Sequence, residues 1–219
     1  MNFYPKPAKL HECFLAGPGN DAELFLVEGD SASKSVARAR DSKNQAVLPM
    51  QGKPMNAAKA SKNSVAKNNL YQNLIACLGA GWDDTFDLDA VRYQRVILLF
   101  DPDADGIHCG ALMLMFFYRW MRPLLEADRL SVVRPPLYQI TSADYRDTIY
   151  AYSGDHFKQV QTALKAKNII YQSQRYRGLA SMGEQTLLQT CLEPDSRHIY
   201  PLGRKDAEAA IAAFGGKLR

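Results

Sequence analysis

The segment 96–106 constrains the fold more than any other part of the chain. Five consecutive apolar residues, Val96–Phe100, lead directly into the acidic turn Asp101–Gly106. A short run that is apolar at every position is typical of a β-strand buried on both faces, as in a parallel sheet covered by helices. Because α/β proteins bind ligands at the carboxyl ends of such strands, the acidic turn is the first candidate for a functional site.

Other short apolar runs alternate with segments of helical periodicity. We predict strands at 24–27, 45–49, 96–100, 130–133 and 148–152. We predict helices at 65–78, 107–127, 156–167, 183–192 and 206–214, and one that follows Gly29 with Asp30 or Ser31 as its N-cap. This alternation indicates the α/β class, with a mostly parallel, helix-covered sheet and a mixed C-terminal tail from about residue 138.

Composition excludes several classes of protein. The 219 residues suffice for one domain with a small appendage, and 47% hydrophobic residues favour a packed globule. No apolar stretch reaches the roughly 18 residues of a membrane span, and the N-terminus lacks the apolar core of a secretory signal. The four cysteines form no CxxC pair, which argues against a zinc ribbon or a disulfide framework. We therefore expect a cytoplasmic protein with no membrane segment.

Charge is distributed unevenly along the chain. Residues 34–67 contain eight Lys and Arg against a single Asp, whereas residues 83–105 contain seven Asp against two Arg. One face could therefore attract a polyanion while another concentrates carboxylates. The alternative interpretation is two solvated faces without a ligand.

Four carboxylates are the candidate metal ligands. Glu28 follows the first apolar run, and Asp101, Asp103 and Asp105 follow the most apolar one. Alternate residues of an extended segment point the same way, so Asp101 and Asp103 could converge while Asp105 begins the turn. Such carboxylates repel one another unless a cation neutralises them, and hard oxygen ligands suit Mg²⁺.

Three other interpretations of the acidic turn are weaker. An EF-hand loop needs an acid at its twelfth position, which is Leu112 when counting starts at Asp101. A phosphatase of the haloacid dehalogenase type usually has Thr or Val where this chain has Asp105. The third is an acidic turn that only caps the following helix.

Several blocks together resemble the TOPRIM domain of the B subunits of type IIA DNA topoisomerases, the family of DNA gyrase and topoisomerase IV. The resemblance runs from about residue 9 to residue 200, in family order. Its blocks are Leu26–Ala32 (LVEGDSA), Lys43–Lys53 (KNQAVLPMQGK), Asp101–His108 (DPDADGIH), Phe116–Arg119 (FFYR), Pro135–Tyr138 (PPLY) and Gln174–Leu179 (QRYRGL). The resemblance implies a Rossmann-like TOPRIM fold.

The resemblance also implies site residues. Glu28, Asp101 and Asp103 would hold Mg²⁺ at the scissile phosphate, with Asp105 as a further candidate ligand. Glu28 would also act as general acid or base at the 3′ oxygen. The residues implied to contact DNA are Lys53, Asn56, Arg175 and Arg177. No nucleotide-binding residues are implied.

The implied organisation is a lead-in segment at 1–20, a TOPRIM core at 21–140 and a tail region at 141–219. The ATPase domain of the family has no counterpart in this sequence, and no tyrosine matches the family's nucleophile. We therefore expect the chain, whether truncated or stand-alone, to be inactive by itself. It would support DNA cleavage and religation together with an A-type subunit that carries the catalytic tyrosine.

Two departures from the family keep other functions open. Gln51 replaces the first cation of a KGK motif, and Ala180-Ser181 replaces a glycine and an acid. The second departure changes the residues of the local turn. One alternative is a non-enzymatic DNA-binding or adaptor protein. The other is a metal-dependent TOPRIM nuclease that acts alone.

Overall fold

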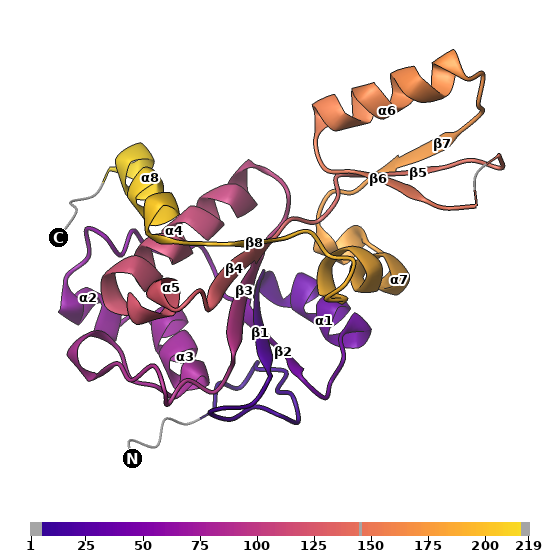
Figure 1. Ribbon diagram of the computed structural model, residues 1–219. Coiled ribbons are helices and arrows are strands. Elements are labelled where there is room, and N and C mark those ends of the chain that lie inside the picture. The colour runs from indigo at the N-terminus through magenta and orange to yellow at the C-terminus, as the bar shows by residue number, and fades with distance from the viewer. Residues whose placement is uncertain (1–5, 145, 216–219) are drawn as a thin grey trace.

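The main sheet has five strands and is mostly parallel (Figure 1). The computed structural model describes residues 6–144 and 146–215. The first five residues of the predicted lead-in, and residues 145 and 216–219 of the predicted tail, lie outside the described residues. The strands are β1 (Glu23–Glu28), β2 (Gln45–Met50), β3 (Arg95–Leu99), β4 (Leu130–Val133) and β8 (Ile199–Pro201). Their order is β2-β1-β3-β4-β8, and only β8 pairs antiparallel. The predicted α/β class is confirmed.

Helices cover both faces of this sheet. Alternate residues of β1 point to opposite faces, and all four of its central residues are buried. Leu24 and Leu26 belong to the core beneath α3 (Asn69–Leu78) and α4 (Ala104–Trp120). Phe25 and Val27 belong to the core beneath α1 (Gly29–Ala39). In the sheet, β2 lies on one side of β1 and β3 lies on the other, so the order of the strands reverses between β1 and β3. The gap between the carboxyl ends of β1 and β3 is therefore the topological switch point.

Local signals explain where most helices begin and end. Asn68 accepts a hydrogen bond from the N–H of Tyr71 and so caps α3, which ends at Gly79 in the left-handed conformation. The predicted helix 107–127 is instead two helices, because Pro123 starts the short α5 (Pro123–Glu126) after α4 has ended. The predicted N-cap of α1 is wrong: Glu28 holds that position, without a side-chain hydrogen bond. The predicted helix 65–78 is likewise divided, into α2 (Lys62–Ala66) and α3.

A second, smaller sheet is built from the later part of the chain. Strands β5 (Tyr138–Thr141), β6 (Ile149–Ala151) and β7 (Gln172–Arg175) pair antiparallel in the order β6-β5-β7. Helix α6 (Gly154–Ala166) covers one face, and together they project away from the main sheet (Figure 1). Strands β5, β7 and β8 were not predicted from the sequence.

The chain returns from the small sheet to the main one. A 3₁₀ turn (Leu179–Ser181), α7 (Glu184–Leu187) and a π-helical turn (Leu188–Leu192) pack near α1, and β8 then joins the edge of the main sheet. Helix α8 (Arg204–Phe214) packs on α4. Within the described part of the chain, no helix is long and apolar enough to span a membrane. The division at residues 20 and 140 stays a prediction.

Candidate metal and DNA site

Glu28 and Asp101 lie at the carboxyl ends of neighbouring parallel strands. Glu28 is the last residue of β1, and Asp101 follows β3 by two residues. The register pairs Val27 with Leu99, so both carboxylates leave the sheet at the same edge. This edge is the switch point, where doubly wound sheets bind their ligands. Strand topology alone therefore brings together two residues that are 73 positions apart.

Two glycines fit closely around Asp101. A Cβ atom on Gly178 would overlap the side-chain carboxylate of Asp101, and a Cβ on Gly106 would overlap its backbone oxygen. The N–H of Leu179 donates to Oδ1 of Asp101 at 2.8 Å. The segment that returns from the small sheet thus fixes the orientation of this carboxylate, and only glycine leaves room for it to do so.

Ser181 builds the turn that presents the Leu179 N–H. Its hydroxyl donates to the carbonyl of Gly178 at 2.7 Å and accepts from the N–H of Arg177 at 3.2 Å. Such side-chain to backbone bonds stabilise tight turns. The Ala180-Ser181 departure from the family pattern therefore leaves a well-bonded turn in this chain.

Removing this hydroxyl has a predicted cost. Ser181→Ala should lower the free energy of unfolding by about 1 kcal/mol, because one neutral hydrogen bond is lost and backbone groups lose a partner. Ser181→Thr keeps the hydroxyl and should stay within about 0.5 kcal/mol of the parent. Urea denaturation measures both values, and equal stability of the two variants would show that the hydroxyl does not support the turn.

Asp103 lies in a helix cap and not in an extended strand, whereas Asp105 lies in the turn where it was predicted. β3 ends at Leu99, so Asp103 does not continue an extended strand. It is the N-cap of α4, and its Oδ1 accepts from the N–H of Gly106 at 2.8 Å. Asp105 lies in the first turn of α4, is exposed, and pairs with Nζ of Lys53 at 3.0 Å. Helix capping is thus part of the role of Asp103.

The carboxylates repel one another. Burial raises the pKa of Glu28, and the charges of Asp101, Asp103 and Asp105 raise it further, while Lys53 opposes them. Burial also raises the pKa of Asp101, against the hydrogen bond from Leu179. Among the residues that the structure describes, no three His, Cys, Asp or Glu side chains form a ready-made metal cluster.

The residues predicted to contact DNA fall into three places. Lys53 lies beside Asp105, at the carboxylates themselves. Arg175 and Arg177 are exposed and line a cleft of about 590 Å³ with Asp103. Asn56 is half-buried; its Nδ2 lies 3.4 Å from the carbonyl of Gly215, at the end of α8. The structure therefore places Lys53 and both arginines beside the acidic turn, and Asn56 at the end of α8.

Comparison with known proteins identifies the family. A family model described as the Toprim domain matches residues 23–135, which is more than half of the chain. The chain belongs to the Toprim domain family. The matched range contains β1, β3 and all four candidate carboxylates.

Over most of its length the chain is also similar to the B subunit of DNA gyrase. It is 39% identical to that protein of Archaeoglobus fulgidus and 40% identical to that of Thermotoga maritima, over 208 residues in each case. The corresponding protein of Staphylococcus aureus is 36% identical. The match covers 95% of this chain but 32% of each relative, so the chain spans about a third of their length. It is a Toprim region related to type IIA topoisomerases.

The carboxylates of this Toprim site fit a magnesium ion. All donors are hard oxygens, and their mutual repulsion is what a bound cation would relieve. Mg²⁺ keeps several waters and commonly takes one or two carboxylates together with substrate phosphate, so a ready-made cage of three protein ligands is not required. Glu28 and Asp101 are the residues best placed to hold it.

Three positioning residues were missed at the level of sequence. Gly178, Leu179 and Ser181 act on Asp101 through backbone groups and a turn hydroxyl, and they lie 77 or more positions after it. The signal was present, because the QRYRGL block was part of the family resemblance. From the sequence, only the two arginines of this block were predicted to have a function, because a charged side chain indicates a DNA contact whereas a backbone N–H carries no signal in the sequence.

Proposed function

We propose that this chain is the metal-binding Toprim component of a type IIA DNA topoisomerase. It supports cleavage and religation of DNA together with an A-type subunit that carries the catalytic tyrosine. The observation that carries this proposal is the placement of Glu28 and Asp101 at the switch point, with Arg175, Arg177 and Lys53 close by.

The carboxylates have two roles, metal binding and proton transfer. Glu28, Asp101, oriented by the Leu179 N–H, and Asp103 bind Mg²⁺, with Asp105 as an outer candidate. Magnesium, when bound, supplies positive charge where negative charge develops on the leaving oxygen. Glu28 accepts or returns the proton of the 3′ oxygen, a role that a raised carboxyl pKa favours.

The cations position the nucleic acid. Arg175 and Arg177 line the same cleft as Asp103, where exposed guanidinium groups can pair with backbone phosphates. Lys53 pairs with Asp105 and can exchange that partner for a phosphate. Contacts of this kind are independent of sequence and weaken as salt rises.

Cleavage of plasmid DNA tests the proposal. The chain is mixed with an A-type subunit from the same organism and Mg²⁺, and broken DNA is trapped with detergent and protease. We expect cleavage that depends on both proteins and is reversed by EDTA. Asp101→Asn should reduce cleavage by at least about 10²-fold, because several kcal/mol of charge stabilisation depend on the ion.

Asp105→Asn is the matched control. It lies in the same turn, but it is exposed and already paired with Lys53, so the loss of cleavage should be less than about tenfold. No cleavage by the pair would contradict the proposal. DNA nicking by the purified chain alone, abolished by Asp101→Asn, would instead identify a stand-alone nuclease.

A further inference from the structure

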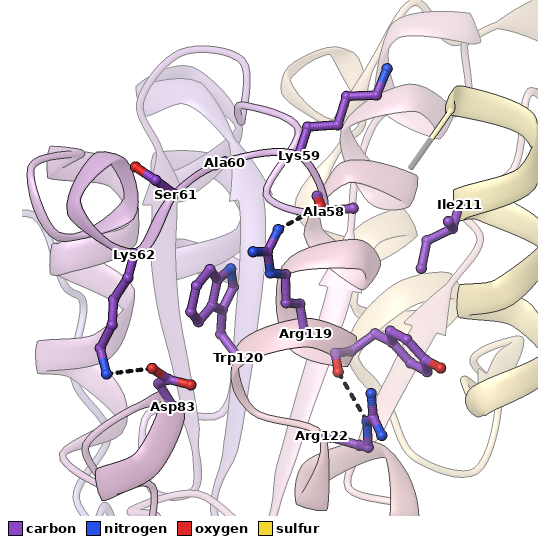
Figure 2. A pocket seen from close by; sticks show the side chains of 11 residues that line it. Ala58, Lys59, Ala60, Ser61, Lys62, Asp83, Arg119, Trp120, Arg122 and Ile211 are labelled. Atoms are coloured by element: carbon purple, nitrogen blue, oxygen red, sulfur yellow. Dashed lines mark hydrogen bonds and ion pairs between the residues drawn. The ribbon is translucent and has the colours of Figure 1, made fainter. Parts of the chain in front are cut away.

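A basic pocket lies at the end of α4 that is remote from the carboxylates (Figure 2). Its volume is about 590 Å³, and it lies between the loop 58–62, the last turn of α4 and α8. Four cations line it: Lys59, Lys62, Arg119 and Arg122. Asp83 is the only acid among its lining residues in the described part of the chain.

The two guanidinium groups are held in fixed places. Arg119 donates to the carbonyl of Ala58 at 2.5 Å and lies 4.6 Å from the ring of Trp120. Arg122 donates to the carbonyl of Tyr118 at 3.3 Å and lies 4.6 Å from its ring. Because these bonds already restrict the side chains, binding an anion here costs little additional conformational entropy.

The two lysines are exposed at the rim. Lys62 pairs with Asp83 at 2.5 Å and with Asp84 at 3.0 Å, and in Figure 2 its amine points to Asp83. Lys59 extends away from the pocket floor. The Lys62 amine is exposed in both pairs, and ion pairs in contact with solvent are weak, so a phosphate can compete with the two aspartates for Lys62.

One segment connects this pocket with the carboxylates. Lys53 contacts Asp105 in the first turn of α4, and residues 57 and 58 contact Arg119 near its end. Arg119 is 14 positions after Asp105, which is about 21 Å along the helix. That length matches about six base pairs of duplex DNA, at an axial rise of 3.4 Å for each base pair.

We propose that this pocket binds a backbone phosphodiester of DNA, about six base pairs from the phosphate at Glu28 and Asp101. The inference rests on the proposed function in one respect, that duplex DNA is the substrate. Charge favours DNA over an acidic peptide, because lysines recur in segment 53–62 from Lys53 at the acidic turn to Lys59 and Lys62 at the pocket, as the phosphates recur along a nucleic-acid backbone.

Salt dependence of duplex binding tests the pocket. Fluorescence polarisation of a labelled 24-base-pair duplex is measured with the full chain in EDTA, at several salt concentrations. Lys59→Ala/Lys62→Ala should lower the magnitude of the slope of log K against log salt by about 0.9, the value for one phosphate contact. The control Lys43→Ala/Lys67→Ala removes two exposed lysines of the same basic stretch outside the pocket, and should leave the slope unchanged. Equal effects of the two double variants would overturn the proposal.

Asp83→Asn gives a change of opposite sign. The substitution removes the carboxylate that competes with DNA phosphate for Lys62. Asparagine also tolerates the left-handed backbone at this position, where φ is 53°. Duplex affinity should therefore rise at least twofold. A fall in affinity would count against a phosphate contact at Lys62.

Tryptophan emission locates the binding. The only two tryptophans, Trp82 and Trp120, lie together at the pocket with ring centroids 5.2 Å apart. Duplex DNA should change their emission in the parent and not in Lys59→Ala/Lys62→Ala.

The outcomes separate this proposal from the proposed function. If Lys53→Ala weakens binding but emission never changes, the proposed phosphate contact in the pocket is wrong and the DNA contact of the proposed function stands. If the pocket variants behave as predicted but the Asp101→Asn cleavage test fails, the pocket stands without the metal chemistry.

Discussion

Glu28→Gln is expected to abolish Mg²⁺-dependent cleavage without weakening the fold. Loss of the general acid or base should reduce cleavage by about 10²- to 10⁴-fold. The fold should be at least as stable as that of the parent at pH 7 without metal, because the substitution removes a charge that burial and three aspartates disfavour. Opposite signs for activity and stability are expected at a site whose charges serve function.

The pH dependence of this stability difference follows from the direction of the pKa shift. Folding raises the pKa of Glu28, so the folded state holds this proton more tightly than the unfolded state. Ionisation of Glu28 therefore destabilises the fold as pH rises from the ordinary glutamate pKa through the raised one. The advantage of the Gln variant should be present at pH 7 and should disappear below the ordinary pKa.

Thermal unfolding with and without Mg²⁺ completes this test. Mg²⁺ should raise the melting temperature of the parent, since a ligand that binds only the folded state stabilises it. The increase should be smaller for Glu28→Gln and unchanged for Glu193→Gln, an exposed glutamate away from the site. Full cleavage by Glu28→Gln would remove the role assigned to this residue.

The main sheet could be predicted because its strands carry their own signal. β1 and β3 are apolar over nearly their whole length, since helices cover both faces. β7 has the sequence QSQR and is exposed throughout, so nothing in its composition distinguishes it from a loop. It becomes a strand by pairing with β5, and that pairing depends on a distant part of the chain.

The site could be predicted in part for the same reason. Glu28 and Asp101 follow apolar strands directly, and parallel pairing then brings them together. The cap formed by Asp103 and the turn formed by Ser181 depend on backbone geometry, which residue types alone do not determine. A contact such as Leu179 to Asp101 crosses 78 positions and leaves no periodic trace in the sequence.

Arg197→Met is expected to lower the free energy of unfolding by about 3–5 kcal/mol, because it leaves the charge of Glu23 buried without its main partner. Arg197 donates to both carboxylate oxygens of Glu23, at 2.5 and 2.7 Å, and its side chain is only 1% exposed. The pair joins the segment before β8 to the first residue of β1. Chemical denaturation measures the loss, and hydrogen exchange should increase in β8 before it increases in β3.

The double variant Glu23→Leu/Arg197→Met separates pairing from packing. It removes both charges, so it should recover at least about 2 kcal/mol relative to Arg197→Met alone. A loss below about 1 kcal/mol in the single variant would show that the pair does not hold the tail.

Glu23 and Glu28 lie at opposite ends of one strand, about 17 Å apart. Arg197→Met should therefore lower stability but retain cleavage under conditions where it is folded, whereas Glu28→Gln should do the reverse. If the two variants differ in this way, a paired charge at one end of β1 stabilises the fold, while repelling charges at the other end serve the reaction.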